Sequence, residues 1–509
     1  ETQCIASLRK IHLPCNNIPL QALFGMMKIT FLIPPVFTKE RPAERTAGCT
    51  TMVYPMANIY ELTVAAVLEQ EGYAVCYEDF ISTKRDVEAF QSFLQTDDFQ
   101  VYVFWSVNLS MRNDLEASER IRRFSPQAYI VYLGPAPTFY VKEFLQHSRQ
   151  VVVRGEPEIT VKEICRYIAD GRDFGEIKGI SVLDSSGAVR NNPPRELLKD
   201  LDTLPFPARH LIDKHYFSNP KLKRSPYTAM VTSRNCPFHC IYCVPSSLTF
   251  ARELESRAYN GGKKPFVSMR TPENVVAEID LLAAEGYKAI GFLDDNFIIT
   301  EKRLLPIAEA LKRHGISWGC QARADAVTEK IATVLGESGC KYVDVGVESF
   351  NNEILAYIKK GLDRTQIIEA IDRLNRHKVP VKLNILIGTS PLETKETIRE
   401  TLDTAIRLKA DQVMINIVAP FPGTEFYTLA KENRWIIGGD YVPTDVQHHS
   451  ILSYPNLTGK EMERLLFRHN LKFFTRPRFI VSQLRRFSSF SEFWKAAKAL
   501  KNKLTYSER

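Results

Sequence analysis

Residues 232–243 read Thr-Ser-Arg-Asn-Cys-Pro-Phe-His-Cys-Ile-Tyr-Cys and follow a short apolar run. They place Cys236, Cys240 and Cys243 in a CxxxCxxC pattern. Structural zinc is normally closed by four Cys or His side chains, and a [4Fe-4S] cluster in an electron carrier takes four cysteines. Three thiolates therefore leave one metal position open. His239 is a poor fourth zinc ligand because it adjoins Cys240, and chelation by both would strain the backbone.

This spacing, with Tyr242 before the third cysteine, resembles the radical S-adenosylmethionine (radical SAM) superfamily. The resemblance implies that Cys236, Cys240 and Cys243 bind a [4Fe-4S] cluster, whose open iron binds the amino and carboxylate groups of S-adenosylmethionine. A zinc knuckle and three ordinary buried cysteines remain the alternatives from the residues alone.

The composition is that of a soluble globular protein with two or three domains: 509 residues, 44% hydrophobic and 25% charged. No run of about 18 apolar residues exists, so we expect no membrane span. Residues 1–25 do not resemble a signal peptide, and we expect an upstream extension over residues 1–27. The need for reduced thiols and the irregular cysteine spacing predict a cytoplasmic protein. The seven other cysteines are expected to be small buried side chains: Cys4, Cys15, Cys49, Cys76, Cys165, Cys320 and Cys340.

The net charge of +8 comes from the carboxyl-terminal tail. Between Lys472 and Arg509 there are ten Lys and Arg residues against Glu492 and Glu508, and the rest of the chain is balanced. This distribution is typical of an enzyme with a basic tail and not of a nucleic-acid binder. From Phe479 onward, apolar residues at helical spacing alternate with Lys and Arg, which predicts a basic amphipathic helix. Such a helix would either contact the inner membrane surface peripherally or pack on the enzyme.

Residues 28–165 alternate strand-like and helical stretches, which predicts a parallel, doubly wound α/β sheet. The segments 32–35, 133–138 and 152–158 resemble the Rossmann-like cobalamin-binding domain that precedes many radical SAM domains. The DxHxxG signature is absent and no histidine follows Pro135, so the resemblance implies cobalamin whose lower face is not held by histidine. A domain that has lost the cofactor is the alternative. At predicted strand ends, the residues expected near cobalamin are Ser106, Asn108 and Gly134.

Residues 166–226 are predicted to be a linker, because their turn and polyproline signals do not support a packed element. Residues 227–424 contain six strand-like runs separated by helical stretches, which predicts a partial (β/α)6 barrel. The cysteine motif follows the first of these runs, at the end of the barrel where active sites are built. Residues 425–509 are expected to be a helical carboxyl-terminal region that ends in the basic tail.

The predicted barrel strands carry polar residues on one face. In residues 343–348 the valines alternate with Asp344, Gly346 and Glu348, and Lys382 and Asn384 share one parity on the next strand. Because the valines suit the surrounding helices, the polar set should point inward. Burying such groups without partners costs roughly 2 kcal/mol or more each. A polar small molecule in the barrel, or a water-filled polar network, would provide those partners.

The resemblance also implies roles for individual residues. Asp294 and Asp295 occupy the position that holds the amino group of S-adenosylmethionine, and Glu348 and Lys360 are candidates for its ribose and carboxylate. The full set of implied S-adenosylmethionine-lining residues is Tyr242, Asp294, Asp295, Arg323, Glu348, Ser349, Lys360 and Asn384.

The branch with a cobalamin-binding domain contains class B methylases, anaerobic cyclases and hopanoid-associated enzymes. The resemblance implies reductive cleavage of S-adenosylmethionine to a 5′-deoxyadenosyl radical, followed by methylation or carbon-skeleton modification of an apolar, lipid-like or tetrapyrrole-like metabolite. It also implies a reductant such as ferredoxin or flavodoxin. The alternatives are a tRNA methylthiotransferase, which would need three further cluster cysteines and a basic RNA-binding module, and a non-enzymatic iron-sulfur or cobalamin carrier.

Overall fold

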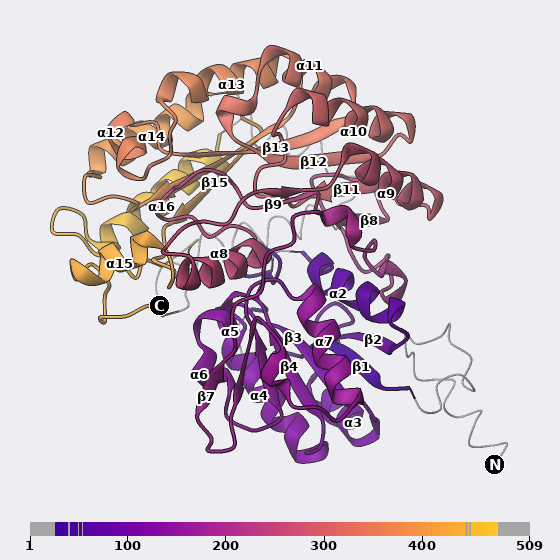
Figure 1. Cartoon of the computed structure of the whole chain (residues 1–509). Helices are drawn as coiled ribbons and strands as arrows, with labels where there is room; N and C mark the ends of the chain where they lie inside the picture. The colour runs from indigo at the N-terminus through magenta and orange to yellow at the C-terminus, as the bar shows by residue number, and fades with distance from the viewer. Residues whose placement is uncertain are drawn as a thin grey trace. The chain divides into compact units, whose positions relative to one another are not determined.

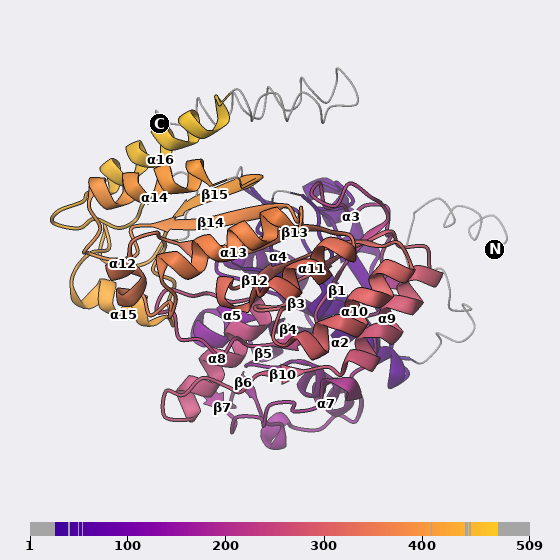
Figure 2. The same cartoon turned by 90° about the horizontal axis from the view of Figure 1, so that it is seen from above.

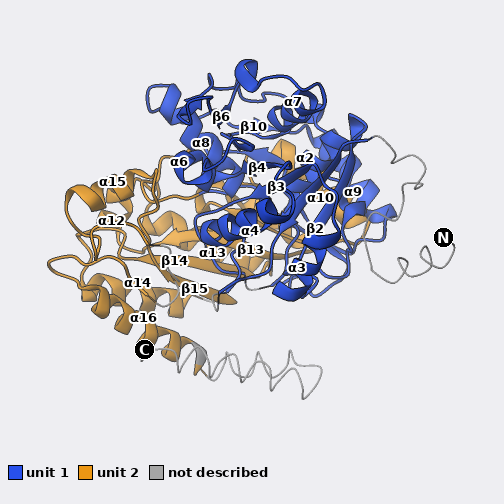
Figure 3. Cartoon of the chain, turned by 90° about the horizontal axis from the view of Figure 1, so that it is seen from below, with its two compact units in different colours: residues 1–236, 245–295 blue, residues 237–244, 296–509 orange. Residues whose placement is uncertain are grey.

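The structure is a computed structural model, which describes residues 26–38, 41–48, 50–52, 54–408, 410–442, 446 and 449–476. The chain divides into two compact units (Figure 3). Unit 1 comprises residues 1–236 and 245–295, and unit 2 comprises residues 237–244 and 296–509. The predicted amino-terminal extension up to residue 25 and the predicted basic tail lie outside the described residues. In the described part of the chain, no helix is both long and apolar enough to cross a membrane.

Unit 1 contains a seven-stranded sheet in the order β2-β1-β3-β4-β5-β6-β7 (Figure 1). The strands β1 to β5 are parallel, which confirms the predicted doubly wound sheet. The strands are β1 (Lys28–Ile33), β2 (Ala74–Asp79), β3 (Val101–Trp105), β4 (Tyr129–Leu133), β5 (Gln150–Val153), β6 (Ile180–Leu183) and β7 (Val189–Asn191). The helices between them are α2 (Ile59–Gln70), α3 (Val87–Thr96), α4 (Met111–Phe124), α5 (Pro135–Phe139), α6 (Val141–Phe144) and α7 (Glu158–Ala169).

The two faces of this sheet are covered by different helices. The helices α2 and α7 pack on each other, as do α3 and α4. One buried cluster joins α3 and α4 to the even-numbered residues of β3 and β4, such as Phe104 and Tyr132. The odd-numbered Trp105 stacks on Tyr60 of α2 on the other face. Both faces are therefore buried, which explains why β3 and β4 are apolar throughout.

The hairpin β6-β7 lies within the predicted linker, where we expected no packed element. The strand β6 pairs antiparallel with β5, and β7 pairs with β6. Asp184 closes the turn, because its carboxylate accepts hydrogen bonds from the backbone N–H groups of Ser186 (2.8 Å) and Ala188 (3.0 Å). Gly187 follows at φ +81°, a conformation that glycine adopts readily. The same polar residues that indicated a loop therefore form the turn of a hairpin.

The second strand series begins in unit 1. There β8 pairs parallel with β11, and β9 pairs antiparallel with β10. The helix α8 directly follows the cysteine motif and is an element that we had not predicted. The elements are β8 (Tyr227–Met230), β9 (Ser233–Arg234), α8 (Ser247–Tyr259), β10 (Ser268–Met269), α9 (Pro272–Ala284) and β11 (Ala289–Phe292).

Unit 2 contains the other four predicted barrel strands, which form parallel pairs in the order β12, β13, β14 and β15. The helix α16 packs against α14 and β15 (Figure 2). The strands are β12 (Ser317–Ala322), β13 (Cys340–Glu348), β14 (Val381–Ile387) and β15 (Gln412–Ile417). The helices are α10 (Glu301–Arg313), α11 (Glu329–Glu337), α12 (Asn352–Tyr357), α13 (Arg364–Arg376), α14 (Lys395–Arg407), α15 (Glu425–Glu432) and α16 (Gly459–Phe474).

Glu61 of α2 is a fully buried carboxyl group beneath the sheet of unit 1. It accepts hydrogen bonds from the Tyr77 hydroxyl (2.6 Å) and from the backbone N–H of Trp105 (3.2 Å). Burial raises the pKa of Glu61 from 4.5 to about 7, and these hydrogen bonds and Arg45 only partly oppose that effect. Glu61 therefore keeps its proton in the folded chain at a pH where the unfolded chain has lost it.

We expect the stability of the Glu61→Gln variant to depend less on pH than that of the wild-type chain. Stability from the proton on Glu61 is fully present below pH 4.5 and is lost as the pH rises through about 7. The loss amounts to at most about 3 kcal/mol, and Gln has no such proton to lose. Thermal midpoints measured from pH 5 to pH 8 would check this, with Glu116→Gln on the exposed side of α4 as the control. Parallel pH profiles for the two variants would contradict it.

Candidate functional site

The three motif cysteines lie in the loop between β9 and α8. None of the three is disulfide-bonded and all are partly exposed, with Cys236 in unit 1 and Cys240 and Cys243 in unit 2. The backbone N–H of Cys243 donates to the carbonyl of Cys240 (3.3 Å), so a tight turn joins the last two cysteines. Among the described residues, no three His, Cys, Asp or Glu side chains are grouped closely enough to hold one metal ion.

The cysteines outside the motif were expected to be small buried side chains. Cys165, Cys320 and Cys340 are free and buried, as expected. Cys76 is also buried, but it is disulfide-bonded, which the irregular cysteine spacing did not predict. The remaining three, Cys4, Cys15 and Cys49, lie outside the described residues.

Glu348 and Lys360 form a buried ion pair beside the cysteine turn of unit 2. Lys360 Nζ lies 2.8 Å from Glu348 Oε1, and both side chains are less than a tenth exposed. Burial lowers the pKa of Lys360, but the Glu348 carboxylate and the Cys240 thiolate outweigh it and raise that pKa above its usual value. Burial and the charges of Glu348, Cys240 and Cys243 raise the pKa of Tyr242. The structure thus brings Tyr242, Glu348 and Lys360 together with two motif cysteines, and their predicted role in binding S-adenosylmethionine stays a prediction.

Glu348 ends β13 in a strained conformation. Its φ of +64° lies in the left-handed region, and the pairing of β13 with β14 shifts register between Gly346 and Glu348. A side chain on Gly346 would place its Cβ 2.9 Å from Glu348 Oε1 and 3.0 Å from Lys360 Nζ. Strain of this kind costs of order 1–3 kcal/mol and is concentrated at functional sites. Gly346 therefore leaves the space beside the ion pair that any side chain would fill.

Arg323 links the cysteine loop to the segment that carries Lys360. Its guanidinium lies 3.4 Å from the ring centroid of Phe238, between the first two cysteines, and donates to the Lys360 carbonyl (3.0 Å). It also pairs with Asp325 (3.1 Å). Arg323 was predicted to line S-adenosylmethionine. In the structure its guanidinium contacts Phe238, the Lys360 carbonyl and Asp325. Phe238 was missed by sequence reasoning, although an aromatic residue inside the cysteine motif is a visible signal.

Asp294 and Asp295 hold the chain on either side of the cysteine loop. The Asp294 carboxylate accepts hydrogen bonds from the backbone N–H (3.1 Å) and hydroxyl (2.7 Å) of Thr232. The Asp295 carboxylate accepts from the backbone N–H of Ser246 (2.6 Å) and the hydroxyl of Thr249 (2.6 Å). We predicted that these residues bind the amino group of S-adenosylmethionine. The structure gives both carboxylates protein partners that position the loop.

Ser349 and Asn384 lie in different surroundings. Ser349 is buried, and its hydroxyl lies 3.1 Å from the Thr401 hydroxyl of α14, on the helix side of the strands. On β14 one face carries the buried residues Val381, Leu383, Ile385 and Ile387. Asn384 is partly exposed and lies on the other face, with the residues between them. The structure therefore separates Ser349 from the polar face that the sequence predicted.

The polar face of β13, β14 and β15 has the predicted parity. Asp344 and Gly346 are partly exposed, while the valines between them are buried. Lys382 Nζ lies 3.3 Å from Asp344 Oδ2, so this pair satisfies itself. The side-chain Oδ1 of Asn416 is buried and has no hydrogen-bond partner. One acceptor on this face is thus available to a ligand or a water molecule.

The residues predicted to lie near cobalamin are at the carboxyl ends of β3 and β4, as expected. The Ser106 hydroxyl donates to Asp114 (2.7 Å), so a buried network occupies it. Asn108 is buried, and Gly134 has φ +100°, with room for no Cβ because that atom would lie 2.6 Å from the Ser106 carbonyl oxygen. Sequence reasoning missed Asn58, whose side-chain Nδ2 is buried without a partner in the loop before α2. Its position before an apolar helix indicated only an N-cap.

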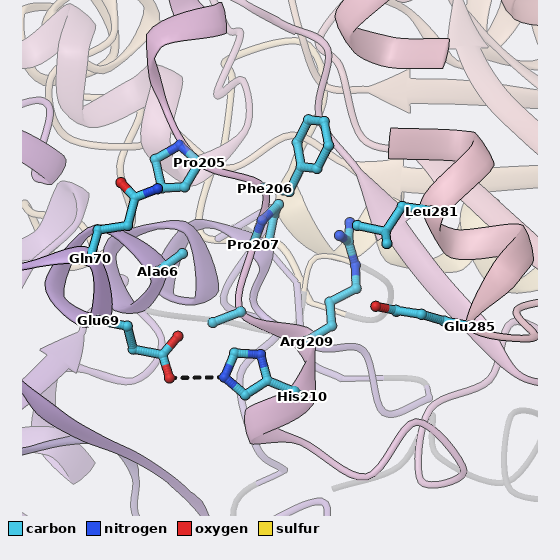
Figure 4. A pocket seen from close by; sticks show the side chains of 11 residues that line it. Ala66, Glu69, Gln70, Pro205, Phe206, Pro207, Arg209, His210, Leu281 and Glu285 are labelled. Atoms are coloured by element: carbon cyan, nitrogen blue, oxygen red, sulfur yellow. Dashed lines mark hydrogen bonds and ion pairs between the residues drawn. The ribbon is translucent and has the colours of Figure 1, made fainter. Parts of the chain in front are cut away.

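A groove on the surface of unit 1 is formed by α2, residues 205–210 and α9 (Figure 4). Two of its charged groups are paired with others: His210 Nε2 lies 2.8 Å from Glu69 Oε1, and Arg209 lies 2.7 Å from Glu278. None of the residues that line it belongs to the cysteine motif or to the polar face of unit 2. The groove is therefore distinct from the candidate site.

Comparison with known proteins finds similarity to one superfamily over part of the chain. Residues 230–405 match the radical SAM superfamily. The chain is 27% identical over 467 residues to an uncharacterized methyltransferase of Pyrococcus horikoshii, which spans 90% of this chain and 95% of that protein. It is 23% identical over 348 residues to the bacteriochlorophyllide d C-12(1)-methyltransferase of Chlorobaculum tepidum, which spans 66% of each protein.

A solved structure shares the fold. The radical S-adenosylmethionine methyltransferase TsrM from Kitasatospora setae, with cobalamin and a [4Fe-4S] cluster bound, matches with a TM-score of 0.63. The match has 19% identity and covers 80% of this chain and 78% of that chain. It confirms the predicted fold class, an α/β chain with a Rossmann-like domain, a partial barrel and a helical region.

We expect Lys360→Met to destabilise the chain much more than the neighbouring Lys359→Met. Removing Lys360 leaves the Glu348 carboxylate buried without its partner, which costs about 3–5 kcal/mol. Lys359 pairs with Glu425 at an exposed site, where a pair contributes about 0–1 kcal/mol. Thermal midpoints of the two variants check the difference. Adding Glu348→Gln to Lys360→Met should recover part of the loss, and a double variant that is no more stable than Lys360→Met would contradict this explanation.

Proposed function

We propose that the protein is a radical SAM enzyme of the cobalamin-dependent methyltransferase type, because residues 230–405 match the radical SAM superfamily and the chain is similar over most of its length to a methyltransferase. The observation that carries this proposal is the set of three cysteines on one loop, none of them disulfide-bonded, with a buried Glu348–Lys360 pair beside two of them. A carrier protein would need the thiols but would have no use for a strained ion pair at the open metal position.

The donor set fits a [4Fe-4S] cluster held by Cys236, Cys240 and Cys243, which are free and partly exposed. The bound cluster supplies the electron, received from a reductant such as ferredoxin or flavodoxin, that cleaves S-adenosylmethionine. Lys360 stays protonated because of its raised pKa, and its charge compensates the thiolates. Arg323 holds the loop through Phe238, so the chain fixes the loop at a point between the first two cysteines.

S-Adenosylmethionine would bind against the polar face of unit 2. Glu348 can accept from ribose hydroxyls while Lys360 attracts the carboxylate, and the absence of a side chain at Gly346 leaves room for both contacts. Asn384 lies one strand away, at the position paired with Gly346. Asn416 Oδ1, which has no protein partner, would accept a donor from the bound molecule or the substrate. Ser349 is held on the helix side of unit 2 by Thr401, while Asp294 and Asp295 hold the chain on either side of the cysteine loop in unit 1.

Cobalamin would bind at the carboxyl edge of the parallel strands of unit 1, where ligands of doubly wound sheets bind. The unpartnered Nδ2 of Asn58 fits this interpretation, because a buried amide without a partner costs free energy until a ligand accepts from it. Gly134 keeps this edge free of a side chain. The TsrM structure, which has cobalamin and a [4Fe-4S] cluster bound, supports the same cofactor pair for this chain.

The substrate class that we propose is a small molecule with an extended apolar body, such as a tetrapyrrole or a lipid. Similarity to a methyltransferase that acts on bacteriochlorophyllide d supports it. The polar pair of Asp344 and Lys382 on the strand face would recognise polar groups at one end of such a molecule. A methyl group would then be added to a carbon that has no acidic proton, which is the kind of step for which cofactor radicals are needed.

We expect Cys240→Ala to abolish cluster binding and reductive cleavage of S-adenosylmethionine. The matched control is Cys320→Ala, which removes a free, buried thiol from β12 outside the motif. After anaerobic reconstitution and reduction with dithionite, iron content and 5′-deoxyadenosine should fall at least about 100-fold in Cys240→Ala and stay near wild type in Cys320→Ala. Equal iron content and equal cleavage in the two variants would contradict the cluster assignment.

We expect the Asn58→Ser variant to bind cobalamin more weakly than the wild-type chain, with an unchanged free energy of unfolding. Serine retains the N-cap of α2 but removes the unpartnered Nδ2. Loss of one buried hydrogen bond weakens binding by roughly 1 kcal/mol, or about fivefold. Cobalt content and the visible spectrum of protein from cells supplied with cobalamin give the measurement. Asn351→Ser, the same change at the N-cap of α12 in unit 2, is the control, and equal cobalt in both variants would contradict the role of Asn58.

A further inference from the structure

The segment Arg154-Gly-Glu-Pro-Glu158, which follows β5, carries three buried charges that all meet residues from the second half of unit 1. Glu158 Oε1 lies 2.6 Å from Arg234, and Glu156 Oε1 lies 2.8 Å from the same guanidinium. Glu156 also lies 2.9 Å from Arg252 Nε. Arg154 pairs with α8, through Glu255 (3.3 Å) and the Tyr259 hydroxyl (2.9 Å). These contacts join residues about 80 to 105 positions apart. Bringing such distant residues together costs loop-closure entropy, which several favourable contacts must offset.

Asn235, the residue immediately before Cys236, adjoins one of these arginines in the chain and is hydrogen-bonded to the other. Arg234 is its neighbour in the chain, and Arg252 donates to the Asn235 side-chain oxygen. Asn235 is buried and has φ +72°, and its backbone N–H donates to the Thr249 hydroxyl (3.2 Å). A left-handed residue other than glycine persists only where its surroundings hold it. The chain direction into Cys236 is therefore set by the arginines that the two glutamates hold.

The side chains of Arg234, Arg252, Glu156 and Glu158 form a four-residue cluster whose net charge is zero only when all four are present. Arg234 and Arg252 are each less than a tenth exposed, as are Glu156 and Glu158. Removing one partner of a buried pair leaves an uncompensated charge, which rearranges or recruits water. The planar guanidinium of Arg234 contacts two carboxylates at once, a geometry that Lys cannot reproduce. The four-residue cluster thus joins the segment after β5 to Arg234 and Asn235, the two residues before Cys236.

We propose that Glu156 and Glu158 are positioning residues that fix the first cysteine ligand of the cluster, Cys236, through Arg234, Arg252 and Asn235. The proposal rests on the proposed function for the identity of the bound cluster, but the support itself is a property of the chain without metal. It assigns to this part of the Rossmann-like domain a role in the cysteine loop instead of in cofactor contact.

Two measurements on the full chain test the proposal, and the first needs no metal. In the metal-free protein we expect the rate of Cys236 alkylation by iodoacetamide, followed by peptide mass spectrometry, to rise about tenfold in Glu156→Gln/Glu158→Gln. In the reconstituted, dithionite-reduced protein we expect altered electron paramagnetic resonance g-values and about tenfold slower formation of 5′-deoxyadenosine. Glu158→Gln alone should show the same changes to a smaller extent, and it decides the question if the double variant does not fold.

The control is Glu78→Gln, which removes a fully buried carboxylate paired with Arg85 (2.6 Å) and outside the four-residue cluster. It should leave Cys236 alkylation and the resonance spectrum at wild-type values. Variants of Glu156 and Glu158 whose rate of Cys236 alkylation matches that of Glu78→Gln would overturn the proposal. If the wild-type chain binds no cluster, the proposed function fails, and the alkylation rates still decide whether the glutamates hold Cys236.

Discussion

Arg234 is buried between Glu156 and Glu158, and the arrangement of unit 1 depends on this contact. A guanidinium taken out of water is tolerable only with its counter-charges at hydrogen-bonding distance, so the loop after β5 and the strand before Cys236 must meet in one way. Asp294 adds a second constraint, because it fixes Thr232 two residues earlier. The approach to the first cysteine is therefore held from two sides by acidic residues that come from different parts of the chain.

Unit 2 holds the other two cysteines by different means. Cys240 faces the Lys360 ammonium, whose charge is stabilised by Glu348, and Arg323 stacks on Phe238 between the first and second cysteines. Each of these cations is buried, so solvent screens its field only weakly. Three thiolates and an iron-sulfur cluster carry net negative charge, and a protonated Lys360 lowers the free energy of that state. The electrostatics of unit 2 thus suit an anionic group at the cysteine turn, whereas unit 1 supplies geometry.

The strands and the cysteine motif could be predicted from sequence because their signals are local. Apolar runs such as that of β14, and the alternation of valines with Asp344 and Gly346, need no knowledge of distant residues. The partners of individual polar side chains could not be predicted in this way. Asp294 binds Thr232, Ser349 turns to Thr401 and Ser106 donates to Asp114, and each choice depends on which elements pack together. The β6-β7 hairpin was missed for the related reason that Asp184 and Gly187 indicate a turn without showing which strands it joins.

The end of β13 shows where parity reasoning stops. Strict alternation places Glu348 on the same face as Asp344 and Gly346, in ordinary strand conformation. The register shift between Gly346 and Glu348, with a φ of +64° at Glu348, instead turns the carboxylate toward Lys360 twelve positions later. The favourable contact with Lys360 must offset the strain of the left-handed backbone, and both would be unnecessary if Glu348 only terminated a strand. A side chain held this way is already in the orientation in which it can bind a ligand, so the free energy of ordering it is spent in folding and not in binding.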